Sequence, residues 1–227
     1  MTSTTPRLPP LSVVIPTLNA TGQLPATLAT LSDAAEIIVV DGGSTDGTPA
    51  AAIRLGARVI TAPRGRGTQL AAGAASATHA WLLLLHADTI LADGWQHTAR
   101  THMATAPDRA GYFRFALDSN DPPARRLARL VAWRCRILAL PYGDQGLLIH
   151  RDLLRRIGGI RPLPLMEDVD LVRRLGRSRL RLLDATATTS AARWQRDGWL
   201  RRSLRNMLCL ALWFAGMPPR HIARLYR

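Results

Sequence analysis

The chain has 227 residues, which suits one large domain or one domain with an extension. A hydrophobic content of 47% excludes a disordered chain, and two cysteines, Cys135 and Cys209, are too few for a disulfide scaffold or a cysteine-based zinc site. All 30 basic residues are arginines, and the formal net charge of +14 indicates an anionic partner.

Short apolar runs alternate with alanine-rich segments in the first half of the chain. Strands are expected over 11–15, 36–40, 58–61 and 81–85, and helices over 22–31, 48–55 and 68–78. Strands that are continuously apolar suit a parallel sheet covered on both faces. Repeated strand–helix–strand units therefore predict an α/β fold with right-handed crossovers.

The second half of the chain is less regular. Strands are expected over 112–117, 146–150 and 179–184, and helices over 123–140, 167–175, 199–216 and from Pro218 onward. We expect a flexible N-terminus over 1–10, an α/β domain over 11–185 and a C-terminal helical extension over 186–227. The N-terminus shows no apolar signal-peptide core, and no apolar run reaches the length of a membrane span. A cytoplasmic protein is expected, with peripheral contact to the inner membrane face as an open alternative.

Polar residues follow three of the expected strands at their carboxyl ends, where open α/β sheets bind ligands. They are Pro16, Thr17 and Asn19 after the first strand, Asp41, Gly42 and Gly43 after the second, and His86 and Asp88 after the fourth. We expect Asp41 to contact a ligand, since the glycines after it allow a close approach. Asp46, before Gly47, suits a helix cap.

Two further groups suit an anionic ligand and a metal. Arg64 and Arg66, interleaved with glycines before a helix, can hold phosphate through guanidinium groups and backbone N–H groups. Asp88 suits a divalent cation that would clamp a diphosphate. Alone, His86 and Asp88 form a weak signal, which would favour a helix N-cap role for Asp88 over metal binding.

Three carboxylates, Glu167, Asp168 and Asp170, open one expected helix. Glu167 and Asp170 share a face, whereas Asp168 points elsewhere. One of the three could be a general base whose pKa is raised by its neighbours. The alternative is compensation of the helix dipole, with pairing to Arg173 and Arg174.

Taken together, these residues resemble a family 2 glycosyltransferase of the GT-A fold. The resemblance covers roughly residues 11–185 and rests on Ser-Val-Val-Ile-Pro-Thr-Leu-Asn over 12–19, Ile-Ile-Val-Val-Asp-Gly-Gly-Ser-Thr-Asp-Gly-Thr over 37–48, the strand that ends at Asp88, and Glu167-Asp168. It implies a mostly parallel central sheet flanked by helices, a UDP- or GDP-linked sugar donor, Mg²⁺ or Mn²⁺, and inversion at the anomeric carbon.

The resemblance also implies roles for individual residues. Asp168 is expected to be the catalytic base, beside Glu167, and the metal is expected at Asp88 and His86. The residues expected to bind the nucleotide sugar are Pro16, Thr17, Asn19, Asp41, Gly43, Arg64, Arg66, Gln69 and Asp88. The residues expected to bind the acceptor are Asp144, Gln145, Arg193 and Trp194.

The chain departs from the family pattern in two places. His86 stands where the family's DXD motif has its first Asp, which removes one negative charge. Ser190 stands where processive enzymes have Gln in Gln-x-x-Arg-Trp, which argues against polymer synthesis. The segments 141–146 and 165–170 are similar to a bacterial subfamily associated with radical-SAM and selenoproteins and linked to arsenosugar biosynthesis.

Two other classes remain as alternatives. A nucleotidyltransferase shares the broad fold and the metal, but its usual glycine-rich basic loop after the first strand is absent. A basic module that binds a membrane or nucleic acid would explain the charge but leaves the acidic residues without a role, so no nucleic-acid partner is expected.

The positive charge is confined to one half of the chain. Residues 1–113 hold 7 arginines and 7 acidic residues, whereas residues 114–227 hold 23 arginines and 9 acidic residues. The excess therefore concerns the acceptor or a partner more than the donor. We expect a phosphorylated or lipid-linked acceptor, and contact of the C-terminal helices with a membrane surface or with a second copy in a homodimer.

Overall fold

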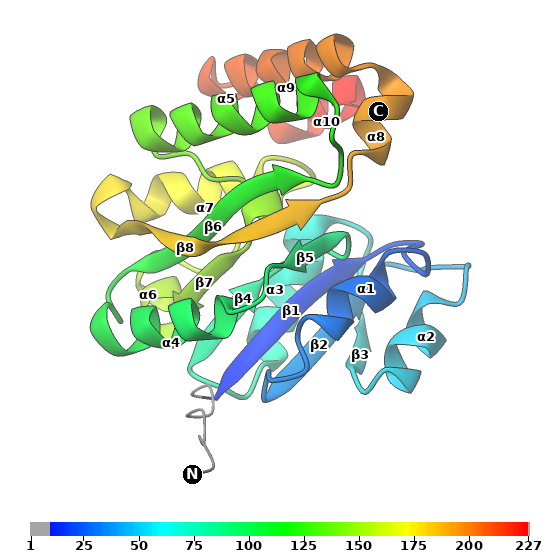
Figure 1. Cartoon of the computed structure of the whole chain (residues 1–227), viewed down its shortest axis with the longest axis vertical. Coiled ribbons are helices and arrows are strands. Elements are labelled where there is room, and N and C mark those ends of the chain that lie inside the picture. The colour runs from blue at the N-terminus through cyan, green and yellow to red at the C-terminus, as the bar shows by residue number, and fades with distance from the viewer. Residues whose placement is uncertain (1–9, 227) are drawn as a thin grey trace.

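The computed structural model describes residues 10–226, so residues 1–9 of the expected flexible N-terminus lie outside the described part. One sheet of eight strands runs through the molecule in the order β3-β2-β1-β4-β7-β6-β8-β5 (Figure 1). The strands are β1 (Leu11–Thr17), β2 (Glu36–Asp41), β3 (Arg58–Thr61), β4 (Trp81–Leu84), β5 (Thr89–Leu91), β6 (Ala110–Leu117), β7 (Leu147–His150) and β8 (Leu180–Thr189).

The sheet is mixed, with its parallel part at the N-terminal end of the chain. Strands β3, β2, β1 and β4 are all parallel, and β6 pairs with β8 in parallel. Antiparallel pairing occurs at β4–β7, β6–β7 and β5–β8. All seven residues of β1 are buried, as expected for a parallel strand covered on both faces.

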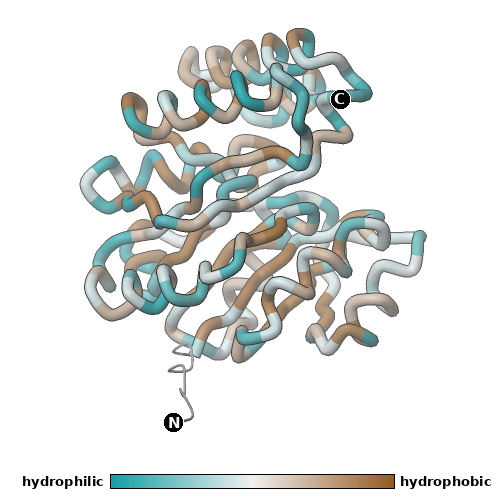
Figure 2. The backbone as a smooth tube through the Cα atoms, in the orientation of Figure 1, coloured by the Kyte–Doolittle hydropathy of each residue, from teal (hydrophilic) through white to brown (hydrophobic). Residues whose placement is uncertain are grey.

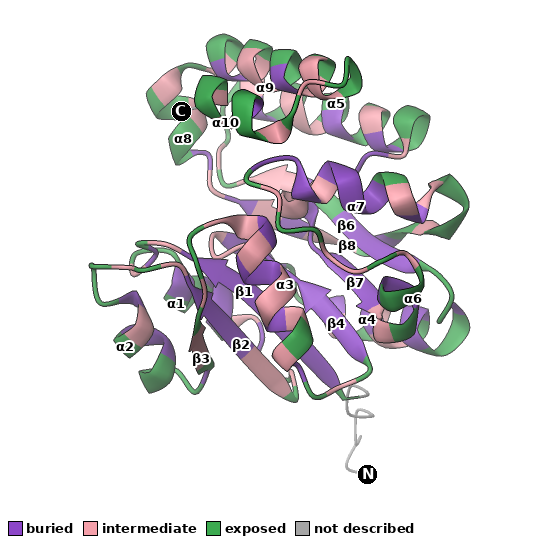
Figure 3. Cartoon of the chain, turned by 180° about the vertical axis from the view of Figure 1, so that it is seen from behind, coloured by how far each residue is buried: buried purple, intermediate pink, exposed green. Residues whose placement is uncertain are grey.

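Helices cover both faces of the sheet, since neighbouring residues of a buried strand point to opposite sides. Val13 lies in one core with α1 (Leu24–Ala29), α2 (Thr48–Arg54) and α4 (Trp95–Thr105). Val14 lies in the other with α3 (Arg66–Ser76), α5 (Pro122–Leu138), α6 (Arg151–Arg156) and α7 (Glu167–Leu175). Seen from behind, α3, α6 and α7 lie on this second face (Figure 3).

The C-terminal helices are α8 (Ala192–Asp197), α9 (Trp199–Phe214) and α10 (Pro219–Tyr226). A third apolar cluster joins them to α7, with Val169 and Val172 packed near Cys209 and Ile222. Both cysteines are buried and unpaired. No helix within residues 10–226 is long and apolar enough to cross a membrane.

The expected α/β architecture is confirmed, but four elements were not predicted. They are β5, α4, α6 and α8, together with short 3-10 turns at Gly143–Gln145 and Arg177–Arg179. The last strand was also predicted too short. Because β8 continues to Thr189, where it pairs with Thr89 of β5, the domain boundary expected at 185 would cut through a strand.

Gly73 tests the packing of α3 on the sheet. A Cβ there would lie 2.8 Å from Val40 Cγ2 and closer still to Val14. Gly73→Ala is expected to lower the free energy of unfolding by about 1–3 kcal/mol, because overpacking outweighs the ~1 kcal/mol gain in helix propensity. Urea unfolding measures this effect. Gly22→Ala is the control, since no atom lies within 4 Å of a Cβ there, and an equal loss in both variants would contradict the packing argument.

Candidate active site

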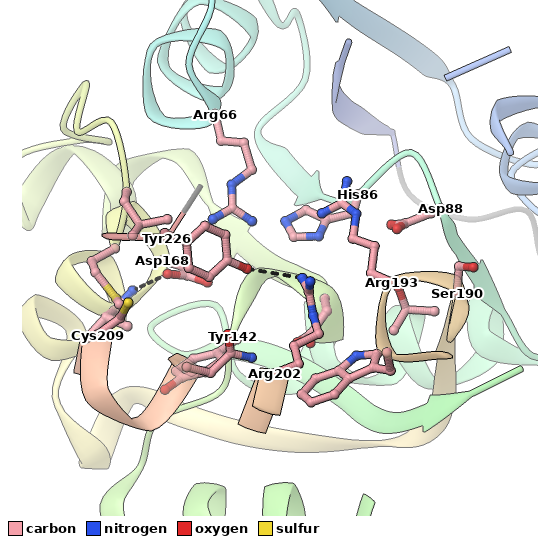
Figure 4. Close-up of a pocket in the computed structure, with 17 residues that line it drawn as sticks. Arg66, His86, Asp88, Tyr142, Asp168, Ser190, Arg193, Arg202, Cys209 and Tyr226 are labelled. Atoms are coloured by element: carbon pink, nitrogen blue, oxygen red, sulfur yellow. Dashed lines mark hydrogen bonds between the residues drawn. The ribbon is translucent and has the colours of Figure 1, made fainter. Parts of the chain in front are cut away.

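Two adjoining cavities form one cleft at the carboxyl ends of the parallel strands. The first has a volume of about 350 Å³ and lies between the end of β1 and the start of α3. The second has about 120 Å³ and lies between α7 and the C-terminal helices. Their shared lining residues are Arg66, His86, Asp88, Ser190 and Arg193. In the second cavity, Arg66 and His86 lie across from Tyr142 and Arg202 (Figure 4).

The larger cavity gathers most of the residues expected to bind the nucleotide sugar. Its lining includes Pro16, Thr17, Asn19, Arg64, Arg66, Gln69 and Asp88. Gln69 has a structural task there, because its Nε2 donates to the backbone oxygens of Thr17 (2.8 Å) and Val40 (2.7 Å). It thereby holds the ends of β1 and β2 against α3, and the residue as a whole is only 3% exposed.

Asp41 and Gly43 are not among the residues that line this cleft. The Asp41 carboxylate is buried and accepts hydrogen bonds from the backbone N–H groups of Gly43 (2.9 Å) and Ser44 (2.8 Å) and from the hydroxyls of Thr17 and Ser44. Burial alone would raise the pKa of Asp41, but these hydrogen bonds stabilise the carboxylate and lower the pKa below its ordinary value. Asp41 therefore shapes the turn after β2, and its expected contact with the nucleoside stays a prediction.

Asp46 forms an Asx turn before α2 and is not its N-cap, which is Gly47. Its Oδ1 accepts from the backbone N–H of Thr48 (3.0 Å) at the first turn of α2, and its Oδ2 accepts from Thr21. The carboxylate thus joins the α2 turn to the loop after β1.

Arg66 opens α3 and connects the two cavities. Its Nε lies 2.9 Å from Glu167 Oε1, and the Glu167 side chain is 1% exposed. Burial raises the pKa of Glu167, while Arg66 opposes that rise. Glu167 therefore orients the guanidinium of Arg66 from behind, and it is absent from the lining of both cavities. We place it as a positioning residue beside Asp168, where the sequence suggested a catalytic one.

Asp168 is the carboxylate of α7 that faces the cleft. It lines the 120 Å³ cavity, and its Oδ2 accepts from the backbone N–H of Gly143 (2.9 Å). Asp170 points away from the cleft and pairs with Arg161 (2.9 Å) and Arg174 (2.7 Å). Of the three carboxylates, it alone forms the expected pairing with an arginine of its own helix. At the start of α7, Asp168 therefore faces the cleft, whereas Glu167 and Asp170 pair with arginines.

His86 and Asp88 lie where the two cavities meet. Burial and the charge of Arg66 lower the pKa of His86, so its imidazole is neutral at pH 7 and suited to bind a metal. The His86 ring can lie here because residue 143 is a glycine, since a Cβ on residue 143 would lie 2.6 Å from His86 Nε2. Among residues 10–226, no three His, Cys, Asp or Glu side chains form a complete metal site. The donor set fits a cation bound by one or two protein ligands and a diphosphate, as Mg²⁺ often is.

Three of the four residues expected to bind the acceptor line the cleft. Asp144, Arg193 and Trp194 lie around the 120 Å³ cavity, and one Asp144 oxygen is buried without a hydrogen-bond partner. Gln145 is the exception. It is 2% exposed, and its Nε2 donates to the Phe113 oxygen (3.0 Å), so it fixes the loop behind the cleft and the expected acceptor contact has no basis in this geometry.

The C-terminal helices supply cleft residues that sequence reasoning missed. These residues are Arg202, Asn206, Cys209 and Tyr226, and Tyr142 joins them from the loop before β7. The Arg202 guanidinium donates to the Tyr226 hydroxyl (3.3 Å) and to Asp197 (2.8 Å). Tyr142 stands inside a motif already singled out and could have been found there. The other four residues carry no local signal, since only the packing of α9 and α10 on α7 brings them to the cleft.

The pH dependence of stability tests the environment of Asp144. Burial raises its pKa to about 6, with Asp168 and Asp88 adding to the rise and Arg134 opposing it. Because the pKa of Asp144 is raised in the folded state, its ionisation disfavours folding. Stability therefore falls as the pH rises from about 4, the ordinary pKa of Asp, to about 6. Asp144→Asn is therefore expected to raise the free energy of unfolding at pH 8 by about 1–2 kcal/mol, after allowance for solvent in the cleft, and to leave it unchanged at pH 4.

Urea unfolding at the two pH values measures the difference. Asp152→Asn is the matched control, because this carboxylate is 64% exposed on α6 and its loss should change stability little at either pH. An equal gain for Asp144→Asn at pH 4 and pH 8 would contradict a raised pKa.

Comparison with solved structures defines the fold class. The chain is similar to glucosyl-3-phosphoglycerate synthase from Mycobacterium tuberculosis in complex with Mn²⁺ and UDP-glucose, with a TM-score of 0.57 and 22% identity over 80% of this chain and 69% of that one. It is also similar to GalNAc-T7 with UDP, GalNAc and Mn²⁺, with a TM-score of 0.61 and 15% identity over 81% of this chain and 44% of that one. The fold is that of the GT-A glycosyltransferases.

Comparison of sequences gives the family. The model of glycosyl transferase family 2 matches residues 12–157, and the chain belongs to this family. Uncharacterized glycosyltransferases of Mycobacterium tuberculosis and Mycobacterium bovis are 40% identical over 79 residues, or 34% of this chain. The match spans 36% of the length of those relatives.

Proposed function

We propose that the chain transfers a sugar from a nucleoside-diphosphate donor to an acceptor hydroxyl, with inversion and with Mg²⁺ or Mn²⁺. The cleft carries this proposal, because arginines at the start of α3, Asp88 and the cleft-facing carboxylate of Asp168 all line it. The similar structures contain UDP, UDP-glucose and Mn²⁺, which supports a UDP-linked donor, and a GDP-linked donor remains in the proposal.

The donor occupies the 350 Å³ cavity in this mechanism. Its diphosphate lies at the start of α3, where Arg64, Arg66 and the helix N-terminus favour negative charge. Asp88 and His86 would hold the ion, which would supply positive charge to neutralise the departing diphosphate. Arg66, oriented by Glu167, stabilises the same charge through its guanidinium group.

The acceptor enters through the 120 Å³ cavity. Asp168 Oδ2 is held by the Gly143 N–H, so its carboxylate is fixed when it takes the proton of the attacking hydroxyl. The hydroxyl oxygen forms the new bond to the anomeric carbon, and the bond from that carbon to the diphosphate oxygen breaks. Attack opposite the leaving group inverts the configuration. Asp144 and Arg193 line the same cavity as Asp168 and can hold acceptor groups.

Transfer is proposed to be non-processive, since Ser190 replaces the Gln of the processive motif. The narrower resemblance to the arsenosugar-linked subfamily stays a prediction. A phosphorylated or lipid-linked acceptor is favoured by the arginines of the second half of the chain. The same arginines are the basis for proposing that the C-terminal helices contact a membrane or a second copy of the chain.

Donor binding and product release test the proposal. A thermal-shift panel of UDP-, GDP- and dTDP-sugars with Mn²⁺ should raise the unfolding temperature for one nucleotide class. Turnover should then release nucleoside diphosphate. Release of inorganic diphosphate would instead identify a nucleotidyltransferase, and the absence of any sugar-nucleotide binding would refute both readings.

A further inference from the structure

Helix α9 turns an apolar stripe toward solvent. Leu200, Leu204, Met207 and Leu208 follow helical spacing, and they are 72%, 52%, 59% and 54% exposed. A helix that packs on a core buries such a stripe, whereas α9 buries only Arg202 and Cys209. Much of α9 and α5 is coloured as exposed in Figure 3.

Helix α5 adds a second exposed apolar row beside α9. Leu130, Trp133 and Ile137 are 62%, 57% and 46% exposed at spacings of three and four residues. The two helices lie next to each other at one end of the molecule, and apolar and polar residues alternate along both (Figures 1 and 2). Contiguous exposed apolar surface of this kind marks an interaction site. We call these two rows the α5–α9 face.

A groove leads from the α5–α9 face to the cleft. It has a volume of about 260 Å³, and its walls include Leu130, Trp133 and Met207. It shares Tyr142, Asp144, Trp194 and Asn206 with the 120 Å³ cavity. An apolar chain in the groove would therefore have its polar end beside Asp144 on the acceptor side of the cleft.

The charge around this face is of one sign. Helices α5, α9 and α10 hold ten arginines and no acidic residue. Arg129 and Arg136 on α5 and Arg201 on α9 are exposed and flank the apolar rows. Arginines around exposed leucine and tryptophan side chains match the boundary of an anionic bilayer, where headgroups meet acyl chains.

We propose that the α5–α9 face docks on an anionic lipid bilayer and that the groove receives the hydrocarbon chain of a membrane-borne acceptor. The acceptor part of this inference rests on the proposed function, whereas the docking part does not. A second copy on the same face would bring two sets of like charges together, which disfavours a symmetric dimer. Nucleic acid would match the arginines and leave the exposed leucines without a partner.

Vesicle co-sedimentation tests the docking. The full chain should pellet with vesicles of phosphatidylcholine and phosphatidylglycerol at low salt and stay in the supernatant with phosphatidylcholine alone. Leu204→Gln/Leu208→Gln should lower the bound fraction at least about tenfold, because burial of two leucines is lost. Ile53→Gln/Leu55→Gln is the matched control, since these residues are 63% and 47% exposed at α2 and should leave binding unchanged.

Three outcomes would overturn the docking. They are equal pelleting with both vesicle types, equal loss of binding in the α9 variant and the α2 control, and a sedimentation-velocity dimer that Leu204→Gln/Leu208→Gln dissociates while vesicle binding is unaffected. Circular dichroism of each variant confirms that it is folded.

Donor turnover separates this inference from the proposed function. Slow hydrolysis of the nucleotide sugar without vesicles should be equal in the wild-type chain and in Leu204→Gln/Leu208→Gln. Transfer to an acceptor with a hydrocarbon chain in anionic vesicles should fall in the variant. Hydrolysis without vesicle binding would overturn the docking alone, whereas vesicle binding without donor binding would overturn the proposed function.

Discussion

Asp168→Asn is expected to lower turnover by about 10²–10⁴-fold and to leave donor affinity nearly unchanged. The amide oxygen of Asn can still accept the Gly143 N–H bond, so the shape of the cleft is retained while the proton acceptor is lost. Nucleoside diphosphate release measures kcat, and calorimetry with the donor measures the dissociation constant.

Asp152→Asn is the control for this change, because its carboxylate lies on the exposed side of α6, outside the lining of both cavities. Its turnover should equal that of the wild-type chain. Full activity in Asp168→Asn would refute the assignment of the base, and a large loss of donor affinity would show that Asp168 acts chiefly in binding.

Asp88→Ala is expected to abolish the dependence of donor binding on Mn²⁺ and to lower kcat/KM by about 10²–10³-fold, since a bound cation contributes several kcal/mol to charge stabilisation. Calorimetry with and without Mn²⁺ measures the first effect directly. His86→Asp restores the carboxylate of the family's usual motif, and it should retain Mn²⁺ dependence.

The Asp93→Ala variant serves as the control, because Asp93 is exposed in the loop before α4. Its donor affinity should respond to Mn²⁺ as the wild-type chain does. If Asp88→Ala still binds the donor more tightly with Mn²⁺, the metal must be held elsewhere.

The parallel part of the sheet was predictable because its strands are buried on both faces and therefore read as continuous apolar runs. The strand β1 shows this most clearly. By contrast, β5 has only three residues and is defined by pairing with β8 far along the chain, and α4 carries polar residues that mask its buried Trp95 and Met103. Long-range pairing and partial burial leave weak local signals.

The candidate site was predictable where one segment supplies several cleft residues. The segment that leads into α3 supplies Arg64 from the loop and Arg66 from the first helical position, and the start of α7 supplies Asp168. The role of Gln145 was misjudged, because its place beside Asp144 does not show that its amide turns into the core. Residue type indicates chemistry, but the direction of a side chain depends on packing.

The wall that α9 and α10 contribute to the 120 Å³ cavity lies beyond residue 157, where the match to the family model ends. In the proposed reaction, water competes with the acceptor hydroxyl for the same anomeric carbon, and protein walls around the acceptor limit this competition. We therefore expect Arg202, Asn206 and Tyr226 to influence how much donor is lost to hydrolysis, although none of them takes part in the proposed chemical step. The partition between transfer and hydrolysis is thus expected to depend on a segment outside the part of the chain that the family model matches.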